Sequence, residues 1–229
     1  MTRFPSKYPA QHPDRIQLYS LATPNGRKAG VMLEESGLPY EAHRVDISGD
    51  QFDPEYVAVN PNSKIPSMID PNGPDGQPIA VFESGAMLIY LAEKSGKLLS
   101  SDPRLRSETL QWLFFQIGGI GPFIGQFGHF YAFARDKTSD DYARTRYTNE
   151  AKRLLGVLDR RLDGREFLVG EDYSIADVAT FPWIMAIDFY KGKDELDYGS
   201  LKNIEPWVQR CASRPATARG LEVTPFPTR

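Results

Sequence analysis

The chain has 229 residues, of which 41% are apolar and 25% are charged, close to the average for soluble globular proteins. Its 27 basic and 30 acidic residues give a net charge of −3, so no broad basic field is available to attract nucleic acid or anionic lipid. The single cysteine, Cys211, excludes an internal disulfide and a cysteine-rich metal site. No apolar run approaches the ~18 residues of a membrane span, so we expect a soluble, cytoplasmic protein that binds neither nucleic acid nor membrane.

The first hundred residues have the pattern of a small α/β domain. Residues 1–14 contain three prolines and no periodicity, which predicts an extended N-terminal arm. Hydrophobic periodicity then predicts strands over 15–20, 40–47, 65–69 and 79–82 and helices over 27–36, 52–59 and 84–96. Turn residues occupy 23–26 and 71–78. The resulting order, βαβαββα, favours parallel pairing at its start and an antiparallel hairpin at its end.

The rest of the chain shows only helical patterns. The composition changes at residues 100–103, which read as a linker between an α/β domain at 15–100 and an all-α domain at 104–229. Apolar side chains recur at helical spacing from Tyr147 to Leu162, and another helix is expected over 203–212. Ser174 and Asp177 have the spacing of a capping box at the head of a further helix. The glycines around Pro122 predict a kinked helix rather than a dinucleotide loop.

Several local motifs, in this order and spacing, resemble those of the cytosolic glutathione transferases. They are Thr23-Pro24-Asn25-Gly26, Lys64-Ile65-Pro66, Glu83-Ser84-Gly85-Ala86, Gln111 to Gly119 and Ser174-Ile175-Ala176-Asp177. The first and fourth are similar to those of the Nu-class and Ure2p-like members. The resemblance implies a thioredoxin-like glutathione-binding domain followed by an all-α domain, a homodimer, and glutathione or glutathione disulfide as the ligand, with no metal.

In the resembled family the Ile65-Pro66 motif binds the peptide backbone of glutathione. An X-Pro bond adopts the cis form at a cost of only about 0.5–1 kcal/mol. A cis bond here turns the N–H and C=O of Ile65 outward, where they can pair with an extended peptide as another strand would. The resemblance assigns this pairing to the cysteinyl residue of glutathione. An ordinary trans proline at a strand start is the alternative.

Charged and polar residues near these motifs are candidates for binding the two ends of glutathione. Glu83 and Ser84 lie where a strand meets a helix, and a helix N-terminus is a natural carboxylate site. Ser84 suits the γ-glutamyl carboxylate and Glu83 the ammonium group, although simple N-capping by Ser84 also explains the pair. Lys64 can bind the glycyl carboxylate with Gln51 as a second donor; an exposed surface role is the alternative for both.

The junction after the first strand faces the sulfur of the ligand in this family. The resemblance favours Thr23 and Asn25 as the residues that stabilise the thiolate, while Tyr19 and Ser20 compete for the role. A hydroxyl and an amide N–H directed at sulfur favour its ionised form. For Asn25 the alternative is an ordinary turn residue in the left-handed conformation.

Arg146 is the candidate for a second glutathione. By resemblance it can reach a carboxylate of that molecule from the long helix of the second domain. Arg144 lies two residues away and therefore faces elsewhere on a helix, so only one of the two can serve. An exposed structural arginine is the alternative.

The leading hypothesis is a glutathione-dependent enzyme, most similar to the Nu-class disulfide reductases, in which the substrate brings the reactive thiol. Cys211 lies on a late helix and is not expected to be the nucleophile. Conjugation of glutathione to an electrophile is the second hypothesis. A glutathione-binding regulator without catalysis is the third, although the arm lacks an Asn/Gln-rich tract.

Overall fold

The computed structural model describes residues 4–227 and divides into two compact units. The first unit contains the chain up to Lys97 together with the segment from Arg214 onward. The second unit is Leu98–Ser213. This corrects the expected division, which placed all of 104–229 in the helical domain, because the C-terminal segment belongs to the α/β unit.

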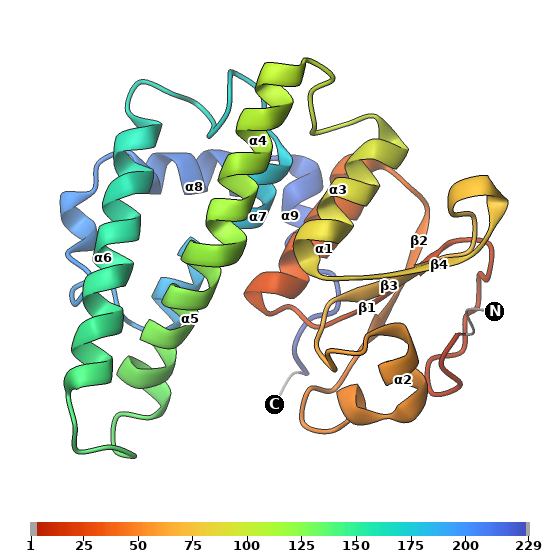
Figure 1. Cartoon of the computed structure of the whole chain (residues 1–229), viewed down its shortest axis with the longest axis horizontal. Coiled ribbons are helices and arrows are strands. Elements are labelled where there is room, and N and C mark those ends of the chain that lie inside the picture. The colour runs from red at the N-terminus through yellow and green to blue at the C-terminus, as the bar shows by residue number, and fades with distance from the viewer. Residues whose placement is uncertain (1–3, 228–229) are drawn as a thin grey trace. The chain divides into compact units, whose positions relative to one another are not determined.

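The α/β unit is a four-stranded mixed sheet with helices on both faces (Figure 1). Its elements are β1 (Ile16–Ser20), α1 (Pro24–Ser36), β2 (Tyr40–Arg44), α2 (Pro54–Val59), β3 (Ser67–Asp70), β4 (Ile79–Phe82), α3 (Ser84–Ser95) and α9 (Pro215–Leu221). The strand order is β2-β1-β3-β4, with β1 parallel to β2 and antiparallel to β3, and β3 antiparallel to β4. The expected thioredoxin-like order and its pairings are confirmed, whereas α9 was not expected.

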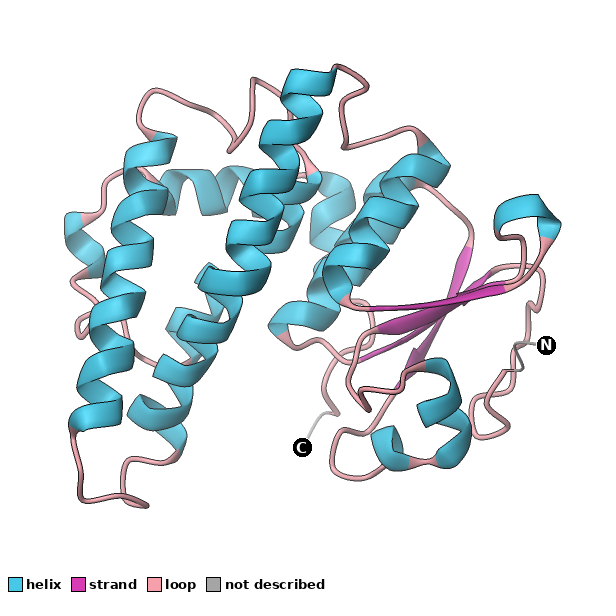
Figure 2. Cartoon of the chain, in the orientation of Figure 1, coloured by secondary structure: helices cyan, strands magenta, loops and turns pink. Residues whose placement is uncertain are grey.

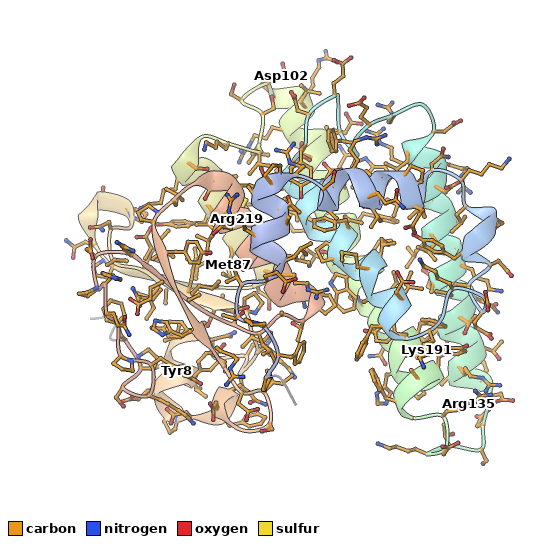
Figure 3. The ribbon with its side chains drawn as sticks, turned by 180° about the vertical axis from the view of Figure 1, so that it is seen from behind. Tyr8, Met87, Asp102, Arg135, Lys191 and Arg219 are labelled. Carbon is orange, nitrogen blue, oxygen red and sulfur yellow. The ribbon has the colours of Figure 1, made fainter. Side chains whose placement is uncertain are left out.

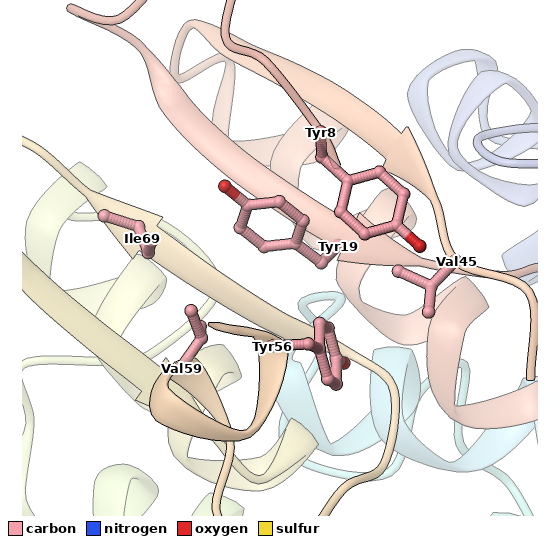
Figure 4. Close-up of a cluster of buried hydrophobic side chains, with 6 residues drawn as sticks. All are labelled: Tyr8, Tyr19, Val45, Tyr56, Val59 and Ile69. Carbon is pink, nitrogen blue, oxygen red and sulfur yellow. The ribbon is translucent and has the colours of Figure 1, made fainter. Parts of the chain in front are cut away.

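A cluster of buried side chains covers the face of the sheet that also carries α2 (Figure 4). It consists of Tyr8, Tyr19, Val45, Tyr56, Val59 and Ile69. Tyr8 belongs to the N-terminal arm and donates a hydrogen bond to Asp50 over 2.8 Å, while Lys7 pairs with the same carboxylate. The described part of the arm is therefore packed onto this chain's own sheet.

Several element boundaries differ from the sequence prediction, each for a local reason. Helix α1 begins at Pro24 rather than Arg27, because Thr23 is its N-cap and proline suits the first helical position. Strand β3 begins at Ser67 because Pro66 has no N–H to donate to a ladder. The expected helix over 52–59 is a 3₁₀ turn at Asp50–Phe52 followed by α2, which Asp53 caps.

Helix α9 packs on α1 through charged groups as well as apolar ones. Glu35 on α1 is 7% exposed and accepts hydrogen bonds from Arg214 Nε and Nη2, both at 2.9 Å, and from Thr217 Oγ1 at 2.8 Å. Arg219 (Figure 3) donates to Glu34 over 2.7 Å. These contacts attach α9 to α1 within the α/β unit.

We expect Glu35→Gln to weaken the attachment of α9 by about 1–2 kcal/mol, since a charged pair with one partly exposed partner contributes less than a fully buried one. Burial raises the pKa of Glu35, but the hydrogen bonds from Arg214 and Thr217 outweigh it, so the pKa lies below its usual value. A lowered folded-state pKa stabilises the protein at neutral pH, and this contribution is lost as the pH falls below about 4.

Hydrogen exchange of the α1 and α9 amides, compared between wild type and variant at the same pH, measures this effect. The difference should be present at neutral pH and shrink at acidic pH. An equal difference at both pH values would contradict the assigned role of the carboxylate.

The second unit is helical throughout its described residues (Figure 2). Its main helices are α4 (Pro103–Phe115), α5 (Gly121–Gly128), α6 (Tyr142–Leu162), α7 (Ile175–Phe189) and α8 (Ile204–Ala212). The expected kink near Pro122 is a π-helical segment, Gln116–Ile120, between α4 and α5. The expected capping box is present at the start of α7, where Ser174 and Asp177 cap each other's backbone.

Candidate functional site

The junction between β1 and α1 presents a hydroxyl at the N-terminus of a helix. Thr23 is the N-cap of α1, and its Oγ1 accepts the N–H of Gly26 over 3.3 Å. A hydroxyl that accepts in this way keeps its own proton to donate. Asn25 lies in the first turn, within the helix, so the alternative of a left-handed turn residue is wrong. This turn carries no acidic residue, and its positive dipole end favours an anion.

The two competing side chains at this junction are both enclosed. Tyr19 is 0% exposed and lies in the buried cluster of Figure 4, where burial raises the pKa of its phenol far above the usual value. Ser20 is also fully buried. Thr23 and Asn25 are half-buried, so a ligand can reach them. Of the four candidates at this junction, Thr23 and Asn25 are thus the less enclosed.

The loop before β3 has the backbone form expected from its proline. The Ile65–Pro66 bond is cis. The carbonyl of Lys64 accepts hydrogen bonds from Tyr56 Oη at 2.8 Å and Asn60 Nδ2 at 2.5 Å, which fix the backbone just before this bond. The Lys64 side chain is exposed.

Gln51 lies in the short 3₁₀ turn after β2. Its Nε2 donates to the carbonyl of Ile47 over 2.6 Å, so one of its two amide protons is already used locally. Its Oε1 is buried and has no hydrogen-bond partner among residues 4–227. The residue therefore has less donor capacity for a ligand than the sequence suggested.

The junction between β4 and α3 differs from the expected cap. Glu83, not Ser84, holds the N-cap position, and its side chain makes no capping bond. Glu83 has φ +69°, a left-handed conformation that is strained for a residue with a side chain and is often found at functional sites. Ser84 is the first helical residue and is 7% exposed. The first N–H groups of α3 are thus not occupied by the cap side chain of Glu83 and can meet an anion.

Lys28 is a residue of this region that the sequence reading missed. It is 1% exposed, and its Nζ lies 3.3 Å from Ser84 Oγ. The sequence contained a signal for the burial of Lys28. The residue falls on the same helical face as the buried Val31 and Met32, three and four residues on.

Arg146 lies in the helical unit and lines a pocket of about 550 Å³. The lining residues are Phe123, Tyr142, Thr145, Arg146, Asn149, Glu150 and Arg153. Arg144 instead pairs with Asp141 over 2.9 Å. Of the two arginines, Arg146 therefore lines the pocket, where Thr145 and Asn149 add hydrogen-bonding groups.

Other chemistry is limited in the described part of the chain. Cys211 is buried in the helical unit, which fits its expected exclusion as a nucleophile. Among residues 4–227 no cluster of three or more His, Cys, Asp or Glu side chains is placed to hold a metal ion. No helix in the same range is long and apolar enough to cross a membrane.

Comparison with known proteins identifies the family. Residues 22–94 match the glutathione S-transferase N-terminal domain, and residues 111–215 match the C-terminal domain. The chain is 46% identical over 221 residues to the disulfide-bond oxidoreductase YghU of Escherichia coli K12, covering 92% of this chain and 74% of YghU. The chain belongs to the glutathione S-transferase family. The resemblance inferred from the motifs is thereby confirmed.

Two solved glutathione transferases are close in structure. The enzyme from Pseudomonas fluorescens Pf-5, with two glutathiones bound, has a TM-score of 0.93 and 55% identity, covering 95% of this chain and 96% of that one. The enzyme from Pseudomonas putida, with one glutathione disulfide per subunit, has a TM-score of 0.92 and 53% identity, with 94% coverage of both. The thioredoxin-like and helical units described above are thus those of a glutathione transferase.

Proposed function

We propose that this glutathione transferase is a glutathione-dependent disulfide reductase. The observation that carries the proposal is the contrast between two groups: the chain's one thiol, Cys211, is buried in the helical unit, whereas Thr23 presents a hydroxyl at the accessible end of α1. The reactive sulfur must then come from the substrate. The name of YghU and the glutathione and glutathione disulfide bound to the two Pseudomonas enzymes support this reading.

The reaction is a pair of thiol–disulfide exchanges. A glutathione thiolate attacks one sulfur of the substrate disulfide, the S–S bond breaks, and the second sulfur leaves as a thiolate that takes up a proton. A second glutathione thiolate then attacks the glutathione sulfur of the mixed disulfide and releases the other half of the substrate. One substrate disulfide is reduced to two thiols, and two glutathiones are oxidised to glutathione disulfide.

Thr23 and Asn25 supply the ionisation of the thiol. A free thiol has a pKa near 8.5, and lowering it by two units requires about 2.7 kcal/mol. Hydrogen bonds to a charged acceptor contribute about 1.5–3 kcal/mol each, so the hydroxyl of Thr23 and one further donor suffice. The N-terminus of α1 adds to the effect.

The remaining candidates bind the rest of the ligands. We assign the Ile65 backbone, ahead of Pro66, to the cysteinyl backbone of glutathione, and Lys64, with Gln51 in a lesser role, to the glycyl carboxylate. Glu83 and Ser84 would hold the γ-glutamyl ammonium and carboxylate. Their support is the helix end at α3 and the strained backbone of Glu83.

Arg146 completes the assignment. Its guanidinium would bind a carboxylate of the second glutathione, as its pocket in the helical unit contains further donors.

The proposal is tested with Thr23→Val and Asn25→Ala. We expect each to lower kcat/KM for bis(2-hydroxyethyl) disulfide by about 10–100-fold, which corresponds to about 1.4–2.7 kcal/mol of lost stabilisation. Thr23→Ser keeps the hydroxyl and should stay near wild type, as should Cys211→Ala.

The ultraviolet absorbance of bound thiolate, followed against pH, should show a higher thiol pKa in Thr23→Val. Loss of turnover in Cys211→Ala with glutathione still bound would instead indicate a protein-thiol mechanism and defeat the proposal.

Conjugation of glutathione to an electrophile is the second candidate. Phe123 and Tyr142 in the Arg146 pocket favour it, since aromatic walls suit an apolar cosubstrate. Comparing the rate with a model haloarene against the rate with a model disulfide distinguishes the two. If neither reaction occurs while glutathione still binds, a regulatory role takes precedence.

We also propose that the enzyme acts as a homodimer in the cytoplasm. A reaction that consumes glutathione needs a reducing compartment, and a chain with one buried cysteine gains nothing from an oxidising one. Native mass spectrometry and fractionation of cells test the two points.

A further inference from the structure

Lys28 is a buried charge whose position the reaction above does not explain. It lies in the second turn of α1, five residues after the Thr23 N-cap, and is 1% exposed. Lysine is almost never fully buried without a partner, because its ammonium group loses its hydration. Its Nζ lies 3.3 Å from the hydroxyl oxygen of Ser84, the first residue of α3.

The charged groups on the elements that pack against α1 can be followed one by one. Helices α3 and α9 and strand β1 pack against α1. At the N-cap of α3, the carboxylate of Glu83, next to Ser84, acts electrostatically on Lys28. The titratable residue of β1, Tyr19, lies in the cluster on the opposite face of the sheet.

The other charges on these elements are engaged elsewhere. Arg214 and Arg219 bind Glu35 and Glu34. On α3, Tyr90 and Lys94 both bind Asp70, and Glu93 is exposed.

We propose that Lys28 is a positioning residue of the glutathione site, which holds the Ser84 hydroxyl toward the γ-glutamyl carboxylate and supplies a buried positive charge that balances this carboxylate. The inference rests on the proposed function, because it assumes that the carboxylate binds at the start of α3.

The direction of the hydrogen bond gives the mechanism. An ammonium group has only donors, so it must donate to Ser84 Oγ, and the hydroxyl proton is then directed away from Lys28 and toward a ligand. A neutral amine can accept that proton instead, which turns the hydroxyl away from the ligand. The protonation state of Lys28 therefore decides whether Ser84 donates to the carboxylate.

The protonation state of Lys28 changes near neutral pH. Burial lowers the pKa of Lys28 to about 7, and the carboxylate of Glu83 opposes part of this effect. A bound γ-glutamyl carboxylate would raise this pKa, so binding above pH 7 should be accompanied by proton uptake. Affinity should then fall as the pH rises through and above 7, and should level off below it.

S-methylglutathione is the suitable probe, since it has no thiol and its pH dependence cannot come from ionisation of the sulfur. Calorimetric titration of the wild-type enzyme at pH 7.5, in two buffers of different ionisation enthalpy, should show uptake of a fraction of a proton per site. Binding without proton uptake would overturn the inference. This measurement requires no variant, so a folding defect cannot obscure it.

Lys28→Met then tests the residue itself. We expect its affinity for S-methylglutathione to be about 5–10-fold weaker than wild type at pH 6.5, with a smaller difference at pH 8.5 and no proton uptake attributable to the side chain. Lys152→Met, which removes a half-exposed lysine from the helical unit, is the control and should keep the wild-type profile. An unchanged affinity and pH profile in Lys28→Met would overturn the inference.

A double-mutant cycle with Ser84→Ala tests whether Lys28 acts through Ser84. In the Ser84→Ala background, Lys28→Met should have a smaller effect than in wild type. Fully additive effects would contradict positioning through the hydroxyl. Failure of the wild-type enzyme to bind S-methylglutathione at all would refute the proposed function instead, so the two failures are distinguishable.

Discussion

Gly26→Ala should abolish most of the glutathione-dependent activity and destabilise the α/β unit. A Cβ at this position would lie 1.8 Å from the carbonyl oxygen of Leu21 and 2.7 Å from Ser20 Oγ. The nearer atom belongs to the backbone and cannot rotate away, so the start of α1 must move. We expect a cost of about 3 kcal/mol or more, at the upper end of overpacking effects.

The activity should fall because Gly26 is tied directly to the site. Its N–H donates to Thr23 Oγ1, so a displaced α1 moves the hydroxyl that we propose stabilises the thiolate. A shift of about 1 Å in a positioning group can lower a rate by about 100-fold. Disulfide reduction and binding of S-methylglutathione, measured on the same preparation, would both be impaired.

Gly156→Ala is the matched control, since it makes the same change within a helix that has room. A Cβ there would meet its nearest neighbour, the Arg160 guanidinium, at 3.5 Å. Alanine in a helix interior is favoured over glycine by about 0.5–1 kcal/mol, so this variant should be as stable as wild type or more stable. Full activity in Gly26→Ala would show that the close approach at Leu21 does not hold the site in place.

Gly26 also shows which features of the fold can be predicted from the sequence and which cannot. The order and pairing of the strands followed from the spacing of apolar residues and from short connections, which are local properties. The composition of Thr23-Pro24-Asn25-Gly26 predicted a turn at these four residues. The close approach of Gly26 to Leu21 depends on the path of the preceding loop, which local sequence does not show. In the structure Pro24, Asn25 and Gly26 begin α1, with Thr23 as the N-cap.

The candidate site likewise has parts that the sequence predicted and parts that only the structure shows. The motifs identified the junctions after β1, before β3 and after β4, because helix ends and proline bonds have recognisable residues. The resemblance favoured Thr23 over Tyr19, but the residues alone could not show that Tyr19 is enclosed, since its burial depends on the cluster formed with the N-terminal arm. The position of Lys28 on the buried face of α1 could be read from the sequence, but its contact with Ser84 on α3, 56 residues further along the chain, could not. Helix α9 was missed for the same reason, as Glu35 lies far from it in sequence.

Asp177 belongs to a motif whose contribution to stability can be judged only from the fold. The sequence indicated a capping box worth about 1 kcal/mol. In the structure the side chain is 0% exposed and accepts four hydrogen bonds. Oδ1 accepts from the Leu168 N–H and from Trp207 Nε1, both at 2.9 Å, and Oδ2 accepts from the N–H and the hydroxyl of Ser174, both at 3.0 Å. One carboxylate thus joins the start of α7, the preceding loop and α8.

Asp177→Ala should therefore cost about 3–5 kcal/mol, far more than loss of a cap, because buried donors are left without an acceptor. The three tryptophans, Trp112, Trp183 and Trp207, all lie in the helical unit, so tryptophan fluorescence reports the unfolding of that unit. With a slope of about 1–3 kcal/mol per M of urea, the midpoint should fall by about 1–5 M.

Ser174→Ala is the matched comparison, since it removes the cap hydroxyl and keeps the carboxylate. It should cost only about 1 kcal/mol. The contrast matters because Asp177 lies outside the candidate glutathione site: Asp177→Ala should lower the amount of folded enzyme while any folded fraction keeps its KM for glutathione. Equal losses for the two variants would mean that the bonds to Leu168 and Trp207 contribute nothing, and that Asp177 is only the second half of a capping box.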